Sequence, residues 1–417
     1  MDKISILGGK TLEGTITISG SKNATLPILA SSLLTSEKSN LSNVPNLLDV
    51  ITMKELLSSL GIKINANQKS LFLEPGNNIS THADYELVRK MRASILVLGP
   101  LLVRFKKAKI SLPGGCAIGT RPIDIHLDSL NKLGVNFEIE NGFVTGIVKD
   151  KLIGTTINLS FPSVGATENL IMAASLAKGT TIINNAAQEP EIVDLVKSLN
   201  SMGAKISGSG SNKIEIKGVE NLYEAEHKIM SDRITAGTFI IAGVMTNSKF
   251  KINNINPKHL SALIEVLNKM NAKLKIEKNS ITVLPTEKII GTSIFTAPYP
   301  GFPTDLQAQM MALMSLATGS SQISEKIFEN RFLHVAELNR LGAKIKIIKD
   351  TAFIEGERSL KGAQVMASDL RASVSLVLAA ICAEGKTVVN RVYHLDRGYE
   401  KIEKTLGNCG PMIIREK

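Results

Sequence analysis

The stretch LPGGCAIGTRPIDIH, residues 112–126, places a thiol among three glycines, with an arginine, an aspartate and a histidine close behind. A thiol reacts as the thiolate, and nearby cations lower its pKa toward neutrality. The glycines let the backbone bend sharply and approach a ligand closely. Cys116 could be a buried structural residue, but glycine-rich loops lie on surfaces, where a packed thiol has little function. The segment therefore predicts an active-site loop.

The elements that must position this loop repeat six times along the chain. In each copy a helix-like stretch ends in a turn and a β-like run follows, as in LNKLGVNFEI and LNRLGAKIKI. The turn residues recur every 68 to 73 positions and suit the left-handed conformation that ends a helix before a strand; they are Gly61, Gly134, Gly203, Asn271, Gly342 and Gly410. A second helix pattern with the same period is apolar nearly all round, which is typical of a buried helix.

A chain of 417 residues is too long for one ordinary core, so two domains of three repeats each are expected. One domain would cover residues 22–229 and carry the Cys116 loop. The other would cover residues 1–21 and 230–417, with its first strand inside residues 3–20. The predicted fold class is α/β or α+β, with buried helices enclosed by sheets; a solenoid is the alternative for tandem repeats.

Composition excludes several classes of protein. The apolar run at residues 94–103 is too short to cross a membrane and contains Gly99 and Pro100. The N-terminus lacks the layout of a signal peptide, and three cysteines without CxxC spacing suggest neither a disulfide framework nor a zinc site. We therefore expect a cytoplasmic protein. A net charge of +11 points to anionic partners, but with no Trp and 4% aromatic residues, small anions fit better than nucleic acid.

Charged side chains gather at the starts of the apolar helices. They are Lys22, Arg92, Glu168, Asp232, Arg233, Asp305, Asp369 and Arg371. Helix N-termini attract anions, so a cation there costs stability unless an anion is bound. If these helix starts meet in one inter-domain cleft, they form a site for a polyanionic substrate with an acid and a base at hand. The aspartates alone could be first-turn stabilisers, and the N-caps are expected at Ser21, Ser231, Thr304 and Ser368.

These motifs resemble those of a known family, the UDP-N-acetylglucosamine enolpyruvyl transferases. The resemblance spans the chain and rests on segments such as SGSKNA (19–24), FPSVGATEN (161–169), APYPGFPTDLQAQ (297–309) and HLDRGYE (394–400), besides the Cys116 loop. It implies two similar domains, each of three βαβαββ-type units, forming an inside-out α/β barrel. It also implies transfer of the enolpyruvyl group of phosphoenolpyruvate to the 3-hydroxyl of UDP-N-acetylglucosamine through a tetrahedral ketal. Phosphate is released, and the step is the first committed one of peptidoglycan synthesis.

The resemblance further implies roles for individual residues, without a metal or organic cofactor. Cys116 would be the general acid, Asp305 the base, and Lys22 a further catalytic residue. Phosphoenolpyruvate would be bound by Lys22, Asn23, Arg121, Arg331, Arg371 and Arg397, with Arg331 and Arg371 on its carboxylate. UDP-N-acetylglucosamine would contact Asn23, Arg92, Arg121, Pro122, Ile123, Asp124, Ile125, Ser163, Val164, Gly165, Asp305 and Ile327. Several cations suit this donor, because it carries both a phosphate and a carboxylate.

Two other functions compete with this one. The 3-phosphoshikimate 1-carboxyvinyltransferases share the fold and the donor, but we expect no LPGGC loop in that family. A basic nucleic-acid-binding repeat protein is a more remote alternative, and its affinity would fall steeply with salt.

Overall fold

A computed structural model describes residues 2–67, 70–112 and 123–416 of the chain. Three residues assigned to the site, Cys116, Arg121 and Pro122, lie outside the described residues. The described chain divides into two compact units. Unit 1 contains residues 2–19 and 231–416, and unit 2 contains residues 20–112 and 123–230.

Six four-stranded sheets share one plan: two parallel strands, then two more that pair antiparallel. In the order β10-β11-β13-β12, β10 (Thr156–Asn158) is parallel to β11 (Thr180–Asn184), which is antiparallel to β13 (Lys213–Lys217). The edge strand β12 (Lys205–Ser207) pairs with β13. Along the chain, helix α6 (Val164–Ala174) connects β10 to β11 and helix α7 (Pro190–Ser201) connects β11 to β12, so this repeat has the order βαβαββ.

Unit 2 has two more sheets of this plan. Their strands are β14 (Ala225–Lys228), β3 (Ser39–Ser42), β5 (Ser70–Pro75) and β4 (Ile62–Ala66), and β6 (His82–Ala83), β7 (Lys107–Ser111), β9 (Phe143–Val148) and β8 (Val135–Glu140). Its remaining helices are α1 (Lys22–Ser31), η1 (Ser32–Leu34), α2 (Leu48–Ser59), α3 (Tyr85–Val88), η2 (Arg92–Val97), α4 (Leu98–Phe105) and α5 (Asp124–Lys132), where η marks a 3₁₀-helix.

Unit 1 repeats the plan three times. Its strands are β2 (Gly14–Thr17), β15 (Phe250–Asn253), β17 (Ser280–Leu284) and β16 (Lys273–Glu277); β18 (Ser293–Phe295), β19 (Ser320–Ser324), β21 (Thr351–Glu355) and β20 (Lys344–Ile348); and β22 (Gln364–Met366), β23 (Lys386–Asn390), β1 (Lys3–Leu7) and β24 (Met412–Glu416). Its helices are α8 (Arg233–Met245), η3 (Pro257–Leu260), α9 (Ser261–Lys269), η4 (Thr304–Leu306), α10 (Gln307–Met314), α11 (Val335–Arg340), α12 (Leu370–Cys382), η5 (Val392–Arg397) and α13 (Ile402–Gly407).

The N-terminal strands belong to the unit formed mainly by the C-terminal half of the chain. Strand β1 pairs with β23 and β24, and β2 runs parallel to β15. In return, β14 is the parallel partner of β3 in unit 2. Three repeats are therefore completed by strands from distant parts of the chain.

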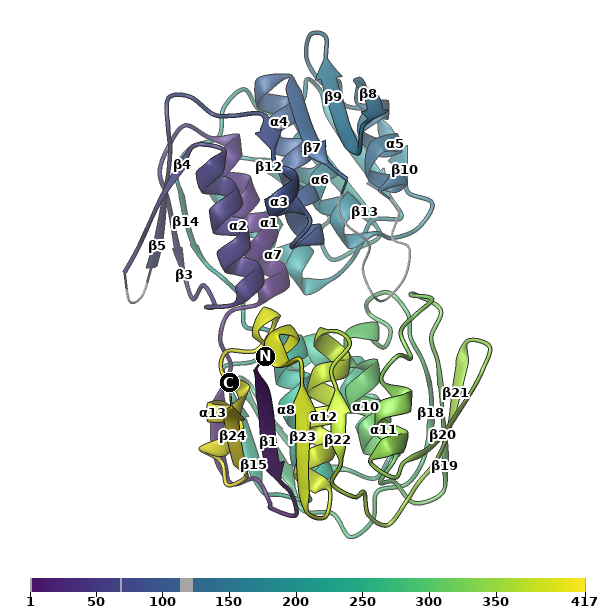
Figure 1. Cartoon of the computed structure of the whole chain (residues 1–417). Coiled ribbons are helices and arrows are strands. Elements are labelled where there is room, and N and C mark those ends of the chain that lie inside the picture. Colours follow the sequence, from purple (N-terminus) through teal and green to yellow (C-terminus); the bar gives the residue numbers. More distant parts are fainter. Residues whose placement is uncertain (1, 68–69, 113–122, 417) are drawn as a thin grey trace. The chain divides into compact units, whose positions relative to one another are not determined.

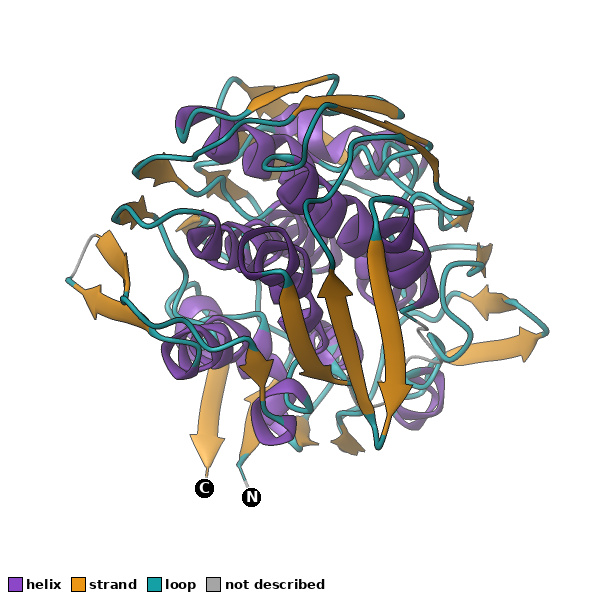
Figure 2. Ribbon diagram, turned by 90° about the horizontal axis from the view of Figure 1, so that it is seen from above, coloured by secondary structure: helices purple, strands orange, loops and turns teal. Residues whose placement is uncertain are grey.

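In each unit the apolar helices lie inside and the sheets lie outside, which Figure 1 shows for α8, α10 and α12; the orange strands also lie outside the purple helices in Figure 2. Each unit has its own hydrophobic core. A Cβ added to Gly237 of α8 would lie 2.7 Å from a methyl carbon of Leu306, so a larger residue there would require the Leu306 side chain to shift. The predicted α/β fold class, with helices buried inside sheets, is confirmed, and the sheets of the described residues remain six separate four-stranded sheets.

The turn residues predicted from the repeat are confirmed, but some predicted N-caps are not. Gly61, Gly134, Gly203, Asn271, Gly342 and Gly410 all have positive φ, between 69° and 123°. Ser21 caps α1 as expected. The caps of α8 and α12 are Asp232 and Asp369 instead of the preceding serines, because each carboxylate accepts two backbone N–H groups. Thr304 is the first residue of η4, and Pro303 precedes it at the cap position.

Candidate active site

Three of the predicted site residues meet in unit 1 around the Asp305 carboxylate. Asp305 is the middle residue of the short helix η4. Its Oδ1 accepts a hydrogen bond from Arg331 Nη2 at 2.7 Å, and its Oδ2 accepts one from Arg371 Nη2 at 2.6 Å. Arg371 lies in the first turn of α12, whereas Arg331 lies in the irregular segment that precedes α11. Residues of three separate chain segments therefore form one charged cluster.

The cluster carries a net positive charge, and both of its arginines are buried. The side chains of Arg331 and Arg371 are 5% and 8% exposed, against 28% for Asp305. Two guanidiniums share one carboxylate, so the three side chains carry one net positive charge. Burial disfavours the charge of Arg371, but Asp305 outweighs this cost and raises the pKa of the guanidinium above its usual value. Within the described part of the chain, the buried Arg331 Nε has no hydrogen-bond partner. A small anion is the ligand that such an arrangement favours.

Two titratable side chains that the sequence analysis did not assign lie beside this cluster. Burial, only partly offset by the charge of Asp369, lowers the pKa of His334 to about 4. Burial raises the pKa of Tyr399, whose hydroxyl lies 2.9 Å from Thr238 Oγ1. Both residues therefore stay neutral near pH 7. Tyr399 lies within the HLDRGYE motif and His334 lies three residues after Arg331, but no sequence signal showed that either side chain borders the arginines.

In unit 2, Lys22 begins α1 and is held by an acidic residue from the next helix. Its Nζ lies 3.1 Å from Asp49 Oδ2, and the two side chains are 11% and 6% exposed. The neighbouring Asn23 is half-buried, and Arg92 is half-buried at the start of η2. Asp49 lies in the first turn of α2, where an acid also suits the helix dipole, so its sequence context did not reveal this ion pair.

The residues assigned to the nucleotide sugar in unit 2 lie at two helix starts. Ser163 caps α6 through a 3.4 Å hydrogen bond from Ala166 N, and Val164 and Gly165 form its first turn. Ile123 is buried at the cap of α5, where Asp124 is exposed and Ile125 half-buried. The two starts are in contact, since a Cβ at Gly165 would lie 3.1 Å from His126 Cε1. The structure therefore brings these two predicted segments together.

Two further predicted residues lie in unit 1. Ile327 is close to the cluster in sequence, and Arg397 is on a separate element, η5. Ile327 is half-buried in the segment before Arg331, and its backbone N–H donates to Glu325 Oε1 at 2.8 Å. Arg397 ends η5 and is half-buried. The preceding Asp396 receives two hydrogen bonds from Arg415 of β24, at 2.9 and 2.6 Å. This pair ties the C-terminal strand to the helix that carries Arg397.

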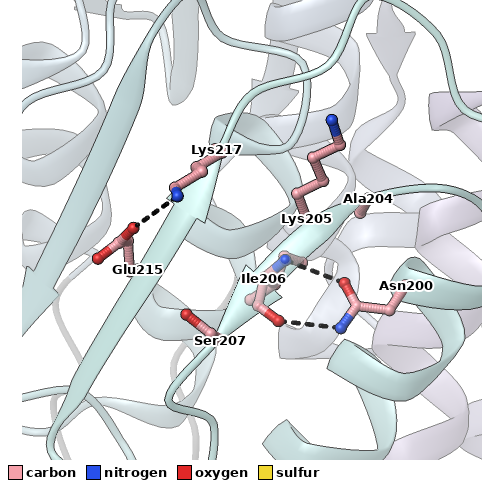
Figure 3. Close-up of a pocket in the computed structure, with 7 residues that line it drawn as sticks. All are labelled: Asn200, Ala204, Lys205, Ile206, Ser207, Glu215 and Lys217. Atoms are coloured by element: carbon pink, nitrogen blue, oxygen red, sulfur yellow. Dashed lines mark hydrogen bonds and ion pairs between the residues drawn. The ribbon is translucent and has the colours of Figure 1, made fainter.

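A separate cavity of about 340 Å³ lies in unit 2, lined by Asn200, Ala204, Lys205, Ile206, Ser207, Glu215 and Lys217 (Figure 3). Asn200 is paired with both backbone groups of Ile206, at 2.9 and 3.0 Å. Lys217 Nζ lies 3.6 Å from Glu215 Oε1. The cavity is lined by none of the predicted site residues, so we do not regard it as the active site.

Neither a metal cluster nor a membrane span is found among the described residues. No three His, Cys, Asp or Glu side chains there are placed to hold a metal ion. No helix in the same part of the chain is long and apolar enough to cross a membrane.

Known proteins resemble this chain over its whole length. The sequence profile of EPSP synthase (3-phosphoshikimate 1-carboxyvinyltransferase) matches residues 6–406. UDP-N-acetylglucosamine 1-carboxyvinyltransferase of Pelagibacter ubique (strain HTCC1062) is 54% identical over 415 residues, covering 100% of both chains. The protein of that name from Granulibacter bethesdensis (strain ATCC BAA-1260 / CGDNIH1) is 50% identical, covering 100% of this chain and 99% of its own. The crystal structure of the enolpyruvyl transferase NikO from Streptomyces tendae has a TM-score of 0.89 at 23% identity, covering 99% of this chain and 98% of its own.

The structural likeness identifies the fold as that of the enolpyruvyl transferases. At 50–54% identity over full length, the resemblance predicted from the motifs is confirmed. The chain belongs to the UDP-N-acetylglucosamine 1-carboxyvinyltransferase family, and it is an enzyme.

Proposed function

We propose that this enzyme transfers the enolpyruvyl group of phosphoenolpyruvate to the 3-hydroxyl of UDP-N-acetylglucosamine and releases phosphate, as a step of peptidoglycan synthesis. The observation that carries the proposal is the pair of buried guanidiniums at Asp305, within a chain of this family. Phosphoenolpyruvate carries a carboxylate that could take the place of Asp305 on Arg331 and Arg371. The guanidinium fork matches a carboxylate better than any other cationic side chain.

The proposed division of roles follows the charges of the substrates. Arg331 and Arg371 hold the carboxylate of phosphoenolpyruvate, while Lys22, Arg121 and Arg397 hold its phosphate, with Asn23 beside them. Asp305 takes the proton of the sugar hydroxyl once the substrate has released its carboxylate from the arginines. Cys116 delivers a proton to the vinyl carbon, with Lys22 assisting. General acid or base catalysis of this kind contributes roughly 10²- to 10⁴-fold.

The nucleotide sugar is proposed to bind along the starts of α5 and α6 and near Ile327. Ser163 to Gly165 and Ile123 to Ile125 lie at adjacent helix starts, where backbone N–H groups favour the diphosphate. Arg92 and Arg121 would add positive charge. The cytoplasm is the proposed compartment, because the two described cysteines, Cys382 and Cys409, are free thiols.

The test is release of inorganic phosphate from phosphoenolpyruvate by the purified enzyme with different acceptors. UDP-N-acetylglucosamine should support release, whereas shikimate 3-phosphate should not. Equal release with shikimate 3-phosphate would favour the activity after which the matching profile is named. If neither acceptor supports phosphate release, both the proposed activity and this alternative are contradicted.

The role of Cys116 has its own test. Fosfomycin, an epoxide that mimics phosphoenolpyruvate, should add its mass to the protein in the presence of UDP-N-acetylglucosamine, and Cys116→Ser should not be labelled. Cys116→Asp should retain some turnover, because a carboxylic acid can still donate a proton. Labelling of the serine variant would assign the adduct to another residue.

A further inference from the structure

The cluster at Asp305 is built from segments that have little regular structure of their own. Helix η4 is only three residues long, and residues 325–334 contain neither helix nor strand. Asp305 and Arg331 nevertheless come within 2.7 Å across 26 positions of sequence. Other contacts must therefore hold these two segments in register.

The Glu325 carboxylate makes these contacts. Its Oε2 accepts a hydrogen bond from Thr304 Oγ1 at 2.6 Å, which ties it to η4 beside Asp305. Its Oε1 accepts from the backbone N–H groups of Ile327 at 2.8 Å and Phe328 at 3.3 Å. A further bond at 2.8 Å comes from Thr296 Oγ1, just after β18. One side chain therefore joins both halves of the Asp305–Arg331 pair.

Because the Glu325 carboxylate is buried, it requires hydrogen-bond donors from the protein. Glu325 is 4% exposed, and its four hydrogen bonds come from neutral donors. A buried carboxylate persists only when its lone pairs are used, and about four acceptor sites are available on the two oxygens. Its own backbone N–H donates to Asp350 O at 2.8 Å, which fixes Glu325 against the β20–β21 turn. Glu325 is thus attached to the sheet that contains β20 and β21.

Residues of both segments that Glu325 joins contact the Arg331 side chain of the charged cluster. Thr304 O accepts a 3.5 Å hydrogen bond from Arg331 Nη2. The Phe328 ring lies 5.5 Å from the Arg331 guanidinium carbon, so the turn held by Glu325 also supports that side chain. Loss of the Glu325 bonds would leave the Arg331 side chain to hold η4 and the 327–331 segment together.

We propose that Glu325 is a positioning residue, whose carboxylate sets the alignment of the base Asp305 with the carboxylate site at Arg331. The alignment matters for the reaction assigned under the proposed function, and the inference rests on that assignment. A displacement of about 1 Å at a reacting group can cost 10²-fold in rate. Glu325 itself touches neither substrate in this scheme.

The kinetic test compares substitutions that keep or remove single bonds. Glu325→Ala should lower kcat by about 10²-fold, and Thr304→Val by about tenfold. Thr304→Ser keeps the hydroxyl and should restore kcat to within about twofold of wild type. Combining Glu325→Ala with Thr304→Val should cost little more than Glu325→Ala alone, because both remove the same link. Glu287→Gln, an exposed acid, is the matched control and should leave kcat unchanged.

A second measurement reports position without turnover. Hydrogen–deuterium exchange of residues 304–306 and 326–331 should accelerate in Glu325→Ala at temperatures well below its Tm, but not in Glu287→Gln. If exchange in both segments is faster in Glu325→Ala but the wild-type enzyme releases no phosphate, the positioning role of Glu325 is supported and the proposed function is contradicted. Unchanged exchange, or equal kcat for Thr304→Val and Thr304→Ser in an active enzyme, would overturn the inference.

Discussion

Arg371 Nη2 lies 2.6 Å from Asp305 Oδ2, although 66 positions of sequence separate the two residues. The carboxylate of Asp305 is the more exposed partner, and the guanidinium is buried. With its other oxygen on Arg331, Asp305 presents to the arginines the same group that phosphoenolpyruvate would present. In the proposed scheme, the substrate carboxylate and Asp305 would compete for these guanidiniums, and binding of phosphoenolpyruvate would free Asp305 to act as the base.

Asp305→Asn separates the two roles of this residue. The amide cannot take a proton, so kcat should fall by roughly 10²- to 10⁴-fold. The same change removes the negative charge that competes for Arg331 and Arg371, so the Kd for phosphoenolpyruvate should fall or stay the same. Calorimetric titration with UDP-N-acetylglucosamine present measures that Kd. A kcat near that of wild type would exclude Asp305 as the base.

Arg371→Lys tests whether the Arg371 guanidinium holds the substrate carboxylate, as proposed. Lysine keeps the positive charge but loses the planar pair of donors, and it prefers water more strongly than a guanidinium does. We expect the KM for phosphoenolpyruvate to rise at least about tenfold, which corresponds to about 1.4 kcal/mol of lost binding. The KM for UDP-N-acetylglucosamine should change much less. Arg340→Lys, on the exposed side of α11, is the control, and an equal response in both variants would contradict the assignment.

The repeat made much of the fold predictable, because helix ends and buried helices recur with one period. The positive φ values at Gly61 and Asn271 follow from helix C-caps, which are local and readable in sequence. The caps at Asp232 and Asp369 were predicted one residue early, since serine and aspartate are both good caps and stand side by side there. The pairing of β14 with β3 was not predicted, because local patterns do not show which distant strands join.

The candidate site was less predictable than the fold. The types of Asp305, Arg331 and Arg371 suggested anion chemistry, but only the folded chain shows that one carboxylate bridges both arginines. Asp49 and Glu325 resemble ordinary surface acids in sequence, and their importance comes from burial and from partners far along the chain. Such contacts depend on tertiary packing, which a single sequence does not display.

Glu168 is expected to make unit 2 less stable as the pH rises. Burial in α6, followed by the charges of Glu191 and Glu189, raises its pKa well above the usual value. Above pH 4.5 the unfolded chain releases this proton while the folded chain retains it, so the free energy of unfolding falls with increasing pH. Glu168→Gln removes the effect and should raise Tm at pH 8 by about 2–4 °C. The gain should shrink toward pH 4.5, and Glu220→Gln, on the surface, should show none.

His334 gives the opposite dependence on pH. Its pKa is lowered to about 4 in the folded state, chiefly by burial, whereas an unfolded histidine titrates near pH 6.5. As the pH falls from about 6.5 to 4, the unfolded chain takes up a proton that the folded chain refuses. The free energy of unfolding should therefore decrease over this window, by up to about 3 kcal/mol. Urea unfolding between pH 4.5 and 7.5 measures the decrease. His334→Gln should lack this part of the slope, while His82→Gln, at an exposed site, should keep it. Parallel curves for His334→Gln and wild type would show that His334 does not contribute to the acid sensitivity.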